Sequence, residues 1–492
     1  MRILPIIVLM PALLIVGGCG HRAPGGPVAV SVIGGETRFV NPARTEPQAA
    51  GAALLGGVAQ GLVRFDAQAQ IVPGLSIRWA ISDDGLYYTF RLDSDGPDAE
   101  RVTRALLQLV RKARMGMLRD RLAAIDDIVA VTPEVIEFRL SSPSPGLITL
   151  LAEPDFAILI DGKGSGPLGI VGKVGKLTIL KPYHQAAVPG ANGKPATDRP
   201  ILLRGEPAAH AVVRFAQGDA ALVTGGRFGD MLLPKLAGIA PTSISLDPVT
   251  GLFGLRIARP TPLLMSIEIR QALSMSLDRE AIGEALGVAG WRSSQSILPP
   301  GLTDLPQPTR PLWAQALANV RRGNDPSLPG RIAIARRIVQ QWVGQHRLTD
   351  MPKVRIAMGN DPGSRILLHQ LSAQWSQIGI AVERAVDGEA ADLRLIDEVA
   401  PLDQADWFLT HFSCSLGPPC SEQADAALAA AMKAINPDER SRLLIEAEAR
   451  LASITPFIPL AQPVRWSLAA PTLPGFKPNA RAIHPLADLI AD

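Results

Sequence analysis

The side chains that could carry chemistry in this sequence are its histidines, its serines and its neighbouring carboxylates. No two of the seven histidines lie within four residues of each other, so no helix face has the His-x-x-x-His spacing of a metal site. No serine stands in a Gly-x-Ser-x-Gly turn, and carboxylate pairs such as Asp83 and Asp84 fall in predicted turns, which they can cap or solvate. We therefore expect no catalytic residue, no metal and no cofactor.

A glycine-rich run at residues 164–169 has the Gly-x-Gly-x-x-Gly spacing of dinucleotide-binding loops. In such loops a helix begins at the glycines. Pro167, followed by Gly169, Gly172 and Gly175, disfavours a helix here. We therefore expect no nucleotide site.

The first 18 residues have the pattern of an export signal. Arg2 is the only early charge, and the apolar run Ile3–Val16 is too short to span a membrane. Two glycines follow it, immediately before Cys19. This ending resembles the lipobox of bacterial lipoproteins, which implies that Cys19 is lipidated and that the Gly- and Pro-rich residues 19–27 form a tether. The alternative is a plain secretory signal that leaves Cys19 as a thiol.

Cys414 and Cys420 remain as a pair, six residues apart around a Gly-Pro-Pro turn. In the oxidising periplasm such a pair can form a disulfide, which is the interpretation we favour. The alternative is two unpaired thiols.

Length and charge limit the remaining function classes. A chain of 492 residues is long enough for two or three domains with a large core. The 49 basic and 46 acidic residues nearly balance, and the sequence has no basic run and few aromatic residues. We therefore expect no nucleic-acid partner.

Hydrophobic periodicity predicts a mixture of helices and short strands, and therefore an α/β fold. Val28–Ile33 is a β-branched run typical of a strand, and Tyr88 and Phe90 alternate with polar residues as a half-buried strand requires. Helical spacing is clear at residues 98–117 and 437–454. Further helices are predicted at 48–62, 269–286, 331–343 and 364–378, and further strands at 75–92, 128–131, 135–140, 353–358 and 380–384.

Several of these segments resemble, in the same order, conserved blocks of the family-five extracellular solute-binding proteins, which include the dipeptide- and oligopeptide-binding proteins of ABC importers. The block Ile269–Ile282, with Arg270-Gln271-Ala272-Leu273 and Asp278-Arg279, is the most specific. The other blocks are Pro73-Gly74-Leu75 with Trp79, Ser82–Leu92, Asp95–Val102, Gly164–Pro167, Gly218–Val223 and Glu446–Leu460. Together they cover nearly the whole mature chain.

The resemblance implies a type II periplasmic-binding-protein fold, with two lobes, a hinge and an inserted subdomain in the first lobe. Lobe I is expected at residues 28–50, 159–246 and 462–492, the inserted subdomain at 51–158 and lobe II at 247–461. The candidate hinge segments are Pro241–Pro248 and Gln462-Pro463.

The resemblance also implies a ligand in the cleft between the lobes. Members that bind peptides hold the ligand backbone with main-chain groups, for which Gly254 in the predicted strand Gly251–Ile257 is our candidate. Asp406, Trp407 and Phe408 lie where such members carry ligand-binding residues, with a carboxylate for the terminal amine. An alternative role for Trp407 and Phe408 is packing in the core.

The expected function is therefore capture of peptides or peptide-like solutes for an ABC permease and its ATPase, without enzymatic activity. We expect a periplasmic monomer, held by its lipid anchor at the outer leaflet of the inner membrane or at the outer membrane. The region after Trp407 is shorter than the family pattern, which leaves other solutes open: a nickel chelate, haem, an opine or an oligosaccharide. A surface lipoprotein hydrolase is the alternative from a different class.

Overall fold

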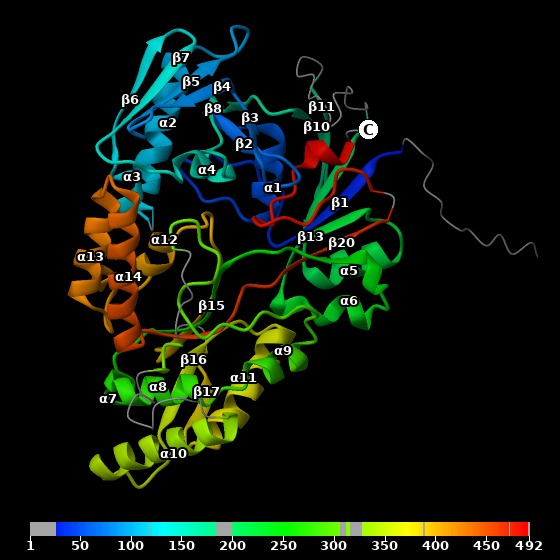
Figure 1. The fold of residues 1–492 in the computed structure, drawn as a ribbon. Helices are drawn as coiled ribbons and strands as arrows, with labels where there is room; N and C mark the ends of the chain where they lie inside the picture. The colour runs from blue at the N-terminus through cyan, green and yellow to red at the C-terminus, as the bar shows by residue number, and fades with distance from the viewer. Residues whose placement is uncertain are drawn as a thin grey trace, which may run out of the picture.

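The computed structural model describes residues 26–116, 118–183, 199–305, 311–314, 327–386, 389–471 and 473–490. The predicted signal peptide and Cys19 lie outside the described residues, as does most of the predicted tether. The chain builds two large sheets and a smaller four-stranded sheet, each covered by helices (Figure 1).

A seven-stranded sheet forms lobe I, in the order β10-β11-β12-β1-β13-β20-β14. Its central strand β1 runs parallel to both neighbours, with Val28 opposite Ile201 and Val30 opposite Leu222. Helix α1 (Ala49–Val58) packs its apolar side chains, Leu54 among them, on this sheet, so the predicted boundary at residue 51 falls inside a lobe I helix. The strands are β1 (Val28–Ile33), β10 (Leu168–Val174), β11 (Leu177–Pro182), β12 (Ile201–Glu206), β13 (Leu222–Arg227), β14 (Ile244–Leu246) and β20 (Arg465–Ala469). Short helices α5 (Ala208–Ala216) and α6 (Leu232–Leu236) complete the lobe.

A five-stranded sheet, in the order β17-β16-β18-β15-β19, forms lobe II. Its strands are β15 (Gly251–Ile257), β16 (Lys353–Ala357), β17 (Ala381–Arg384), β18 (Leu393–Val399) and β19 (Phe457–Ala461). Helices α8 (Ile267–Met275), α10 (Leu328–Gln345) and α11 (Pro362–Ser376) share one apolar core with it, and α12 (Ala405–Thr410), α13 (Glu422–Lys433) and α14 (Pro437–Ile454) share another. Short helix α7 (Pro262–Met265) precedes α8. The predicted helix at 269–286 is two helices, because Asp278 caps α9 (Arg279–Leu286) by accepting a hydrogen bond from the Ala281 amide at 3.0 Å.

The inserted subdomain is a four-stranded antiparallel sheet, in the order β4-β5-β7-β6, covered by α2 (Ala99–Ala113). Tyr88 and Phe90 on β5 are buried, as their alternation predicts, and Phe90 meets Phe138 edge to face. Asp98 caps α2 through the Arg101 amide at 2.9 Å. The elements are β2 (Val63–Phe65), β3 (Ile71–Pro73), β4 (Ser76–Ile81), β5 (Tyr87–Leu92), α3 (Arg119–Leu122), β6 (Ile125–Thr132), β7 (Val135–Leu140), α4 (Leu147–Leu151), β8 (Leu159–Ile160) and β9 (Lys163–Gly164).

Two segments cross between the lobes side by side, one from β14 to β15 and the other from β19 to β20 (Figure 1). The Gly251 amide donates to Gln462 Oε1 at 3.0 Å, and the Asp247 amide donates to the Arg465 carbonyl at 3.0 Å. These bonds tie the first crossing to the second, so the two segments form one hinge.

Candidate functional site

Charged side chains from both lobes meet beside the hinge. Asp397 on β18 of lobe II accepts a hydrogen bond from Arg465 Nη1 at 2.7 Å, and its carbonyl accepts one from Arg465 Nη2 at 3.0 Å. Arg227, at the end of β13, places Nη1 3.9 Å from the other Asp397 carboxylate oxygen. Burial lowers the pKa of Arg465, while Asp397 opposes that shift. One carboxylate of lobe II thus faces two arginines of lobe I.

Arg227 is much more exposed to solvent than Arg465. Its side chain is 60% exposed, against 10% for Arg465. It stands at the carboxyl end of a parallel strand pair, which is where open α/β sheets bind their ligands. Its guanidinium can therefore reach a solute without giving up a buried bond.

Glu398, the next residue on β18, supplies the opposite charge. His411 Nε2 lies 3.1 Å from Glu398 Oε2, and His411 Nδ1 lies 2.8 Å from the Trp407 carbonyl. The hydrogen bond from His411 lowers the pKa of the Glu398 carboxyl, and Arg256 and Arg227 add to that effect. Glu398 therefore stays ionised at neutral pH and, being half-exposed, is available to a cation.

Asp406 lies at the junction between lobe II and the inserted subdomain. Arg121 of α3 donates to Asp406 Oδ2, and Arg440 Nη2 of α14 lies 3.9 Å from Oδ1. The Asp406 side chain is 3% exposed. Arg121 thus holds one oxygen of the carboxylate that we expected to bind a ligand amine, while the buried Oδ1 accepts no hydrogen bond from the described residues.

Trp407 and Phe408 belong to the apolar core between α12, α13 and α14. Phe408 is fully buried, and Trp407 meets it edge to face with 4.9 Å between ring centroids. Trp407 contacts His411, the partner of Glu398, through its carbonyl and through the His411 ring, whose centroid lies 4.4 Å from that of the Trp407 ring. The packing role is the one that this geometry supports.

Gly254 lies in the interior of the lobe II sheet, opposite Ile396 on β18 and Pro459 on β19. A Cβ at this position would meet the Ile458 carbonyl oxygen at 2.4 Å, so glycine permits the close approach of β19. Since β15 has a neighbour on each side, it offers no free edge to the backbone of a ligand.

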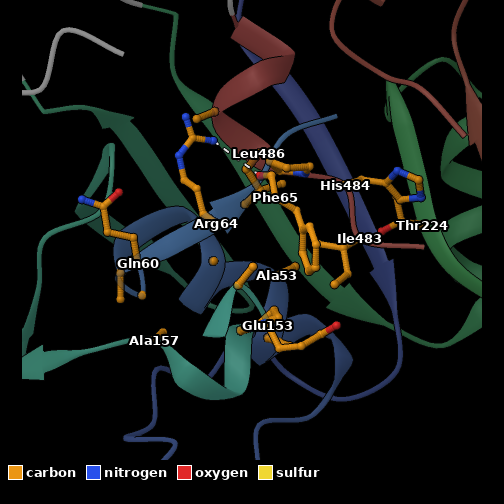
Figure 2. A pocket seen from close by; sticks show the side chains of 18 of the residues that line it. Ala53, Gln60, Arg64, Phe65, Glu153, Ala157, Thr224, Ile483, His484 and Leu486 are labelled. Atoms are coloured by element: carbon orange, nitrogen blue, oxygen red, sulfur yellow. Dashed lines mark hydrogen bonds between the residues drawn. The ribbon is translucent and has the colours of Figure 1, made fainter. Parts of the chain in front are cut away.

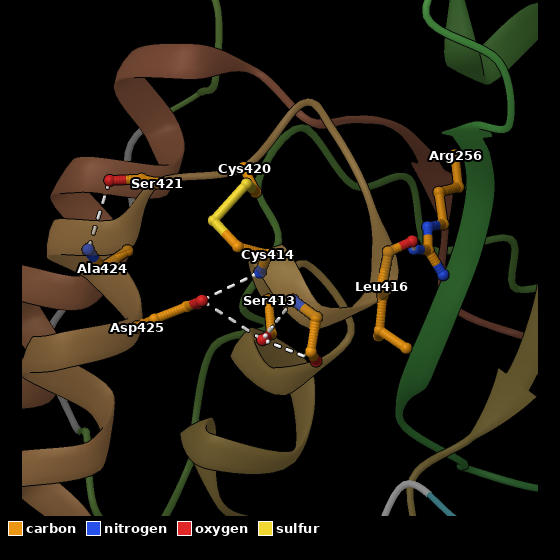
Figure 3. Close-up of a disulfide and its surroundings, with 9 residues drawn as sticks. Arg256, Ser413, Cys414, Leu416, Cys420, Ser421, Ala424 and Asp425 are labelled. Carbon is orange, nitrogen blue, oxygen red and sulfur yellow. Dashed lines mark hydrogen bonds between the residues drawn. A yellow bond between two sulfur atoms is a disulfide. The ribbon is translucent and has the colours of Figure 1, made fainter.

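Cys414 and Cys420 are joined by a disulfide with an S–S distance of 2.17 Å (Figure 3). Asp425 of α13 accepts hydrogen bonds from the Cys414 amide at 2.9 Å and from Ser413 Oγ at 3.3 Å. On the other side of the loop, the Leu416 carbonyl accepts one from Arg256 Nη2 at 2.8 Å. The loop closed by the disulfide is thus fastened both to α13 and to β15.

Ser467, His484 and Asp247 form the grouping most like a hydrolase triad among the described residues. Ser467 Oγ lies 3.5 Å and Asp247 Oδ2 3.2 Å from the same His484 nitrogen, Nε2. In a catalytic triad the nucleophile and the acid bond to different ring nitrogens. Ser467 is also 1% exposed, so the geometry does not support nucleophilic attack.

Residues 70–410 match the family described as bacterial extracellular solute-binding proteins, family 5 Middle. The chain belongs to this family. The match confirms the resemblance read from the ordered blocks. Within the described residues, no helix is long and apolar enough to cross a membrane, and no three His, Cys, Asp or Glu side chains are grouped as metal ligands.

Solved structures extend the likeness to the whole fold. Haemophilus influenzae OppA in complex with RPPGFSPFR has a TM-score of 0.75 at 15% identity, covering 94% of this chain and 98% of that one. The Escherichia coli murein tripeptide binding protein MppA has a TM-score of 0.75 at 17% identity, covering 94% and 97%. NikZ from Campylobacter jejuni in complex with Ni(L-His) has a TM-score of 0.70 at 19% identity, covering 93% and 97%. No curated protein sequence matches the chain.

The charged residues beside the hinge were missed by the sequence reasoning, and the sequence contains little that could have identified them. Arg227 and Arg465 are 238 positions apart, and Asp397 meets them only because two sheets adjoin. The one usable signal is that Arg465 closely follows the predicted hinge segment Gln462-Pro463.

Proposed function

We propose that this protein captures peptides or peptide-like zwitterionic solutes in the interlobe cleft and delivers them to an ABC importer. The observation that carries the proposal is the pair of exposed, opposite charges beside the hinge, Arg227 on lobe I and Glu398 on lobe II. A solute with a carboxylate and an ammonium group can bond to both, and in doing so it joins the lobes.

Hinge closure is the mechanism that follows. A solute that contacts both lobes binds the closed form better than the open form, so its binding shifts the equilibrium towards closure. The solute carboxylate bonds to Arg227 and its ammonium to Glu398, while Asp397 and Arg465 keep the hinge in register. The closed form is the one that the permease recognises.

Mass spectrometry tests the substrate class. The exported chain carrying Cys19→Ser is purified gently and denatured, and the released small molecules are identified. Short peptides support the proposal; a single non-peptide species, such as a nickel chelate or an opine, replaces the substrate and keeps the fold. NikZ with Ni(L-His) and AgaA with agropinic acid, of similar fold, make these alternatives concrete.

Calorimetry with the peptides so identified tests the two charges. Arg227→Gln is expected to weaken binding about tenfold or more, because charge-assisted hydrogen bonds contribute most inside a closed cleft. The matched control is Arg78→Gln, an exposed arginine on β4 of the inserted subdomain. Equal affinity of the wild type and Arg227→Gln contradicts the role given to Arg227.

We also propose that the protein is a lipoprotein anchored through Cys19 and that it does not turn over its solute. Cys19→Ser is expected to release the protein from the membrane fraction; retention there contradicts the anchor. Incubation with ester and peptide substrates is expected to leave them intact, and robust turnover that is lost on a single Ser or His substitution contradicts a pure binding function.

A further inference from the structure

A cavity of about 240 Å³ lies between lobe I and the inserted subdomain, beside α1 (Figure 2). It is bounded by α1, by the segment that returns from the inserted subdomain, by the end of β13 and by the C-terminal segment at residues 482–487. None of the described residues of lobe II lines it. The cavity is therefore separate from the charged residues Arg227, Asp397 and Glu398 beside the hinge.

The cavity exists because one face of α1 carries only small side chains. Ala49, Ala52, Ala53 and Gly56 recur at the spacing of a single helix face and line the cavity. The opposite face carries Leu54 and its apolar neighbours and fills the core. Phe65, Ile483 and Leu486 form much of the remaining wall.

Glu153 is the acidic side chain of this wall (Figure 2). Within the described part of the chain, its carboxyl accepts no hydrogen bond and forms no ion pair. Burial raises the pKa of Glu153 to about 8, which the positive charge of Arg481 opposes and the negative charge of Asp155 reinforces. The Arg481 guanidinium is already bonded to Asp403 at 2.7 Å, so it does not neutralise Glu153.

Three other polar side chains of the wall, those of His484, Gln60 and Arg64, have contacts of their own. His484 Nε2 lies 3.2 Å from Asp247, outside the cavity, and Gln60 Nε2 donates to the Ser165 carbonyl at 2.9 Å. Arg64 lies beside the Phe65 carbonyl and contributes positive charge near Asp488. Glu153 is thus the acidic residue of the wall, and among the described residues its carboxyl has no hydrogen-bond or ion-pair partner.

We propose that this cavity binds a small organic cation, with a primary ammonium group at Glu153 and a compact apolar body against Phe65, Ile483 and Leu486. A cavity of about 150 Å³ admits benzene, so the space suffices for an ammonium group carried on one ring or a short chain. Bonding to the ammonium gives the carboxylate a counter-charge, which favours the ionised form and lowers its pKa. Binding therefore releases a proton from Glu153 at neutral pH.

Benzylamine and its neutral isostere benzyl alcohol are the probes, titrated by calorimetry into the exported chain carrying Cys19→Ser. Benzylamine is expected to bind at least tenfold more tightly than benzyl alcohol, and about tenfold more tightly near pH 8 than near pH 6.5, because the Glu153 carboxylate becomes populated in that range. Glu153→Gln is expected to abolish the preference for the amine. Equal binding of the two probes, or no binding of benzylamine at millimolar concentration, overturns the proposal.

Gly56→Leu provides a second variant that does not alter the charge. A Cβ at Gly56 meets no atom within 4 Å, so a leucine side chain can enter the cavity without disturbing the backbone of α1. It is expected to weaken benzylamine binding at least tenfold and to leave peptide binding unchanged; undiminished benzylamine binding to this variant also overturns the proposal. Since the amine titration does not depend on any peptide, the two proposed functions succeed or fail separately.

Discussion

Arg121 of the inserted subdomain and Asp406 of lobe II form a buried ion pair, with side chains 6% and 3% exposed. The two residues are 285 positions apart in the chain, and they fasten α3 to α12. In Figure 1 these elements lie where the inserted subdomain approaches α13 and α14. The pair joins two parts of the molecule that lie far apart along the chain.

Arg121→Met is expected to destabilise the protein by about 3–5 kcal/mol, because it leaves the buried Asp406 carboxylate without its principal partner. Urea unfolding measures the loss. The matched control is Arg91→Met, which breaks an exposed pair with Glu134 and is expected to cost less than about 1 kcal/mol. Similar losses of unfolding free energy in the two variants contradict a structural role for the buried Arg121–Asp406 pair. Adding Asp406→Leu to Arg121→Met is expected to recover part of the stability, since no unpaired charge then stays buried.

The hinge pair Asp397–Arg465 gives a second prediction. Asp397→Asn is expected to cost about 3 kcal/mol or more, since Arg465 and Arg227 both lose their counter-charge in one step. Chemical denaturation provides the measurement. Glu383→Gln, which breaks an exposed pair with Lys353, is the control and is expected to stay within about 1 kcal/mol of the wild type. An Asp397 variant as stable as this control contradicts a structural role for the pair.

The raised pKa of Glu153 leads to a third prediction, on how the stability of the protein depends on pH. Because its folded pKa of about 8 lies above the ordinary value of 4.5, the folded protein binds this proton more tightly than the unfolded chain. The stabilisation is complete below pH 4.5 and disappears as the pH rises through about 8, a loss on the order of 5 kcal/mol. Glu448, whose pKa burial raises to about 7, contributes in the same direction.

Thermal melts between pH 5 and about 8.5 test this prediction. Glu153→Gln is expected to flatten much of the decline in Tm, and the further change Glu448→Gln to flatten more of it. A Glu153→Gln curve parallel to that of the wild type shows that the carboxyl is not protonated in the folded protein.

The disulfide gives a fourth prediction. Cys414 and Cys420 close a short loop of sequence separation 6, so chain-entropy arguments give about 2 kcal/mol of stabilisation. The double variant Cys414→Ser/Cys420→Ser is expected to lose about this much in urea unfolding, and alkylation of denatured, unreduced wild-type protein is expected to label neither cysteine. Labelling of both cysteines contradicts the pairing in the cell.

The parts of the fold that the sequence predicts are the helices and strands whose hydrophobic pattern and end residues lie within the segment itself. Val28–Ile33 is a strand and Pro437–Ile454 a helix because each carries its own period and boundary residues, such as the Asn436 cap. The cap of α9 by Asp278 is also local. Arg270, in contrast, is buried and donates hydrogen bonds to the Thr455 carbonyl at 2.9 Å and the Leu264 carbonyl at 2.6 Å, two contacts that only the folded chain creates.

The site depends on contacts that no local pattern records. Asp406 was predicted as a ligand-binding residue from the order of residues along the chain, which does not reveal that its partner Arg121 lies on the inserted subdomain. The strand Gly251–Ile257 was predicted with its observed bounds, yet only the sheet order reveals that it has neighbours on both sides. Contacts between side chains of different lobes depend on how the sheets are arranged in space, which local sequence patterns do not specify.

The place of β20 in the lobe I sheet also determines when that lobe can fold. This strand lies between β13 and β14, although it comes almost last in the chain. Lobe II, whose sheet uses only residues 251–461, can form its hydrogen bonds first, whereas the lobe I sheet stays incomplete until residues 465–469 arrive. The lobe I sheet therefore joins the first described strand of the chain to one of its last, so a truncation before residue 465 removes β20 from between β13 and β14.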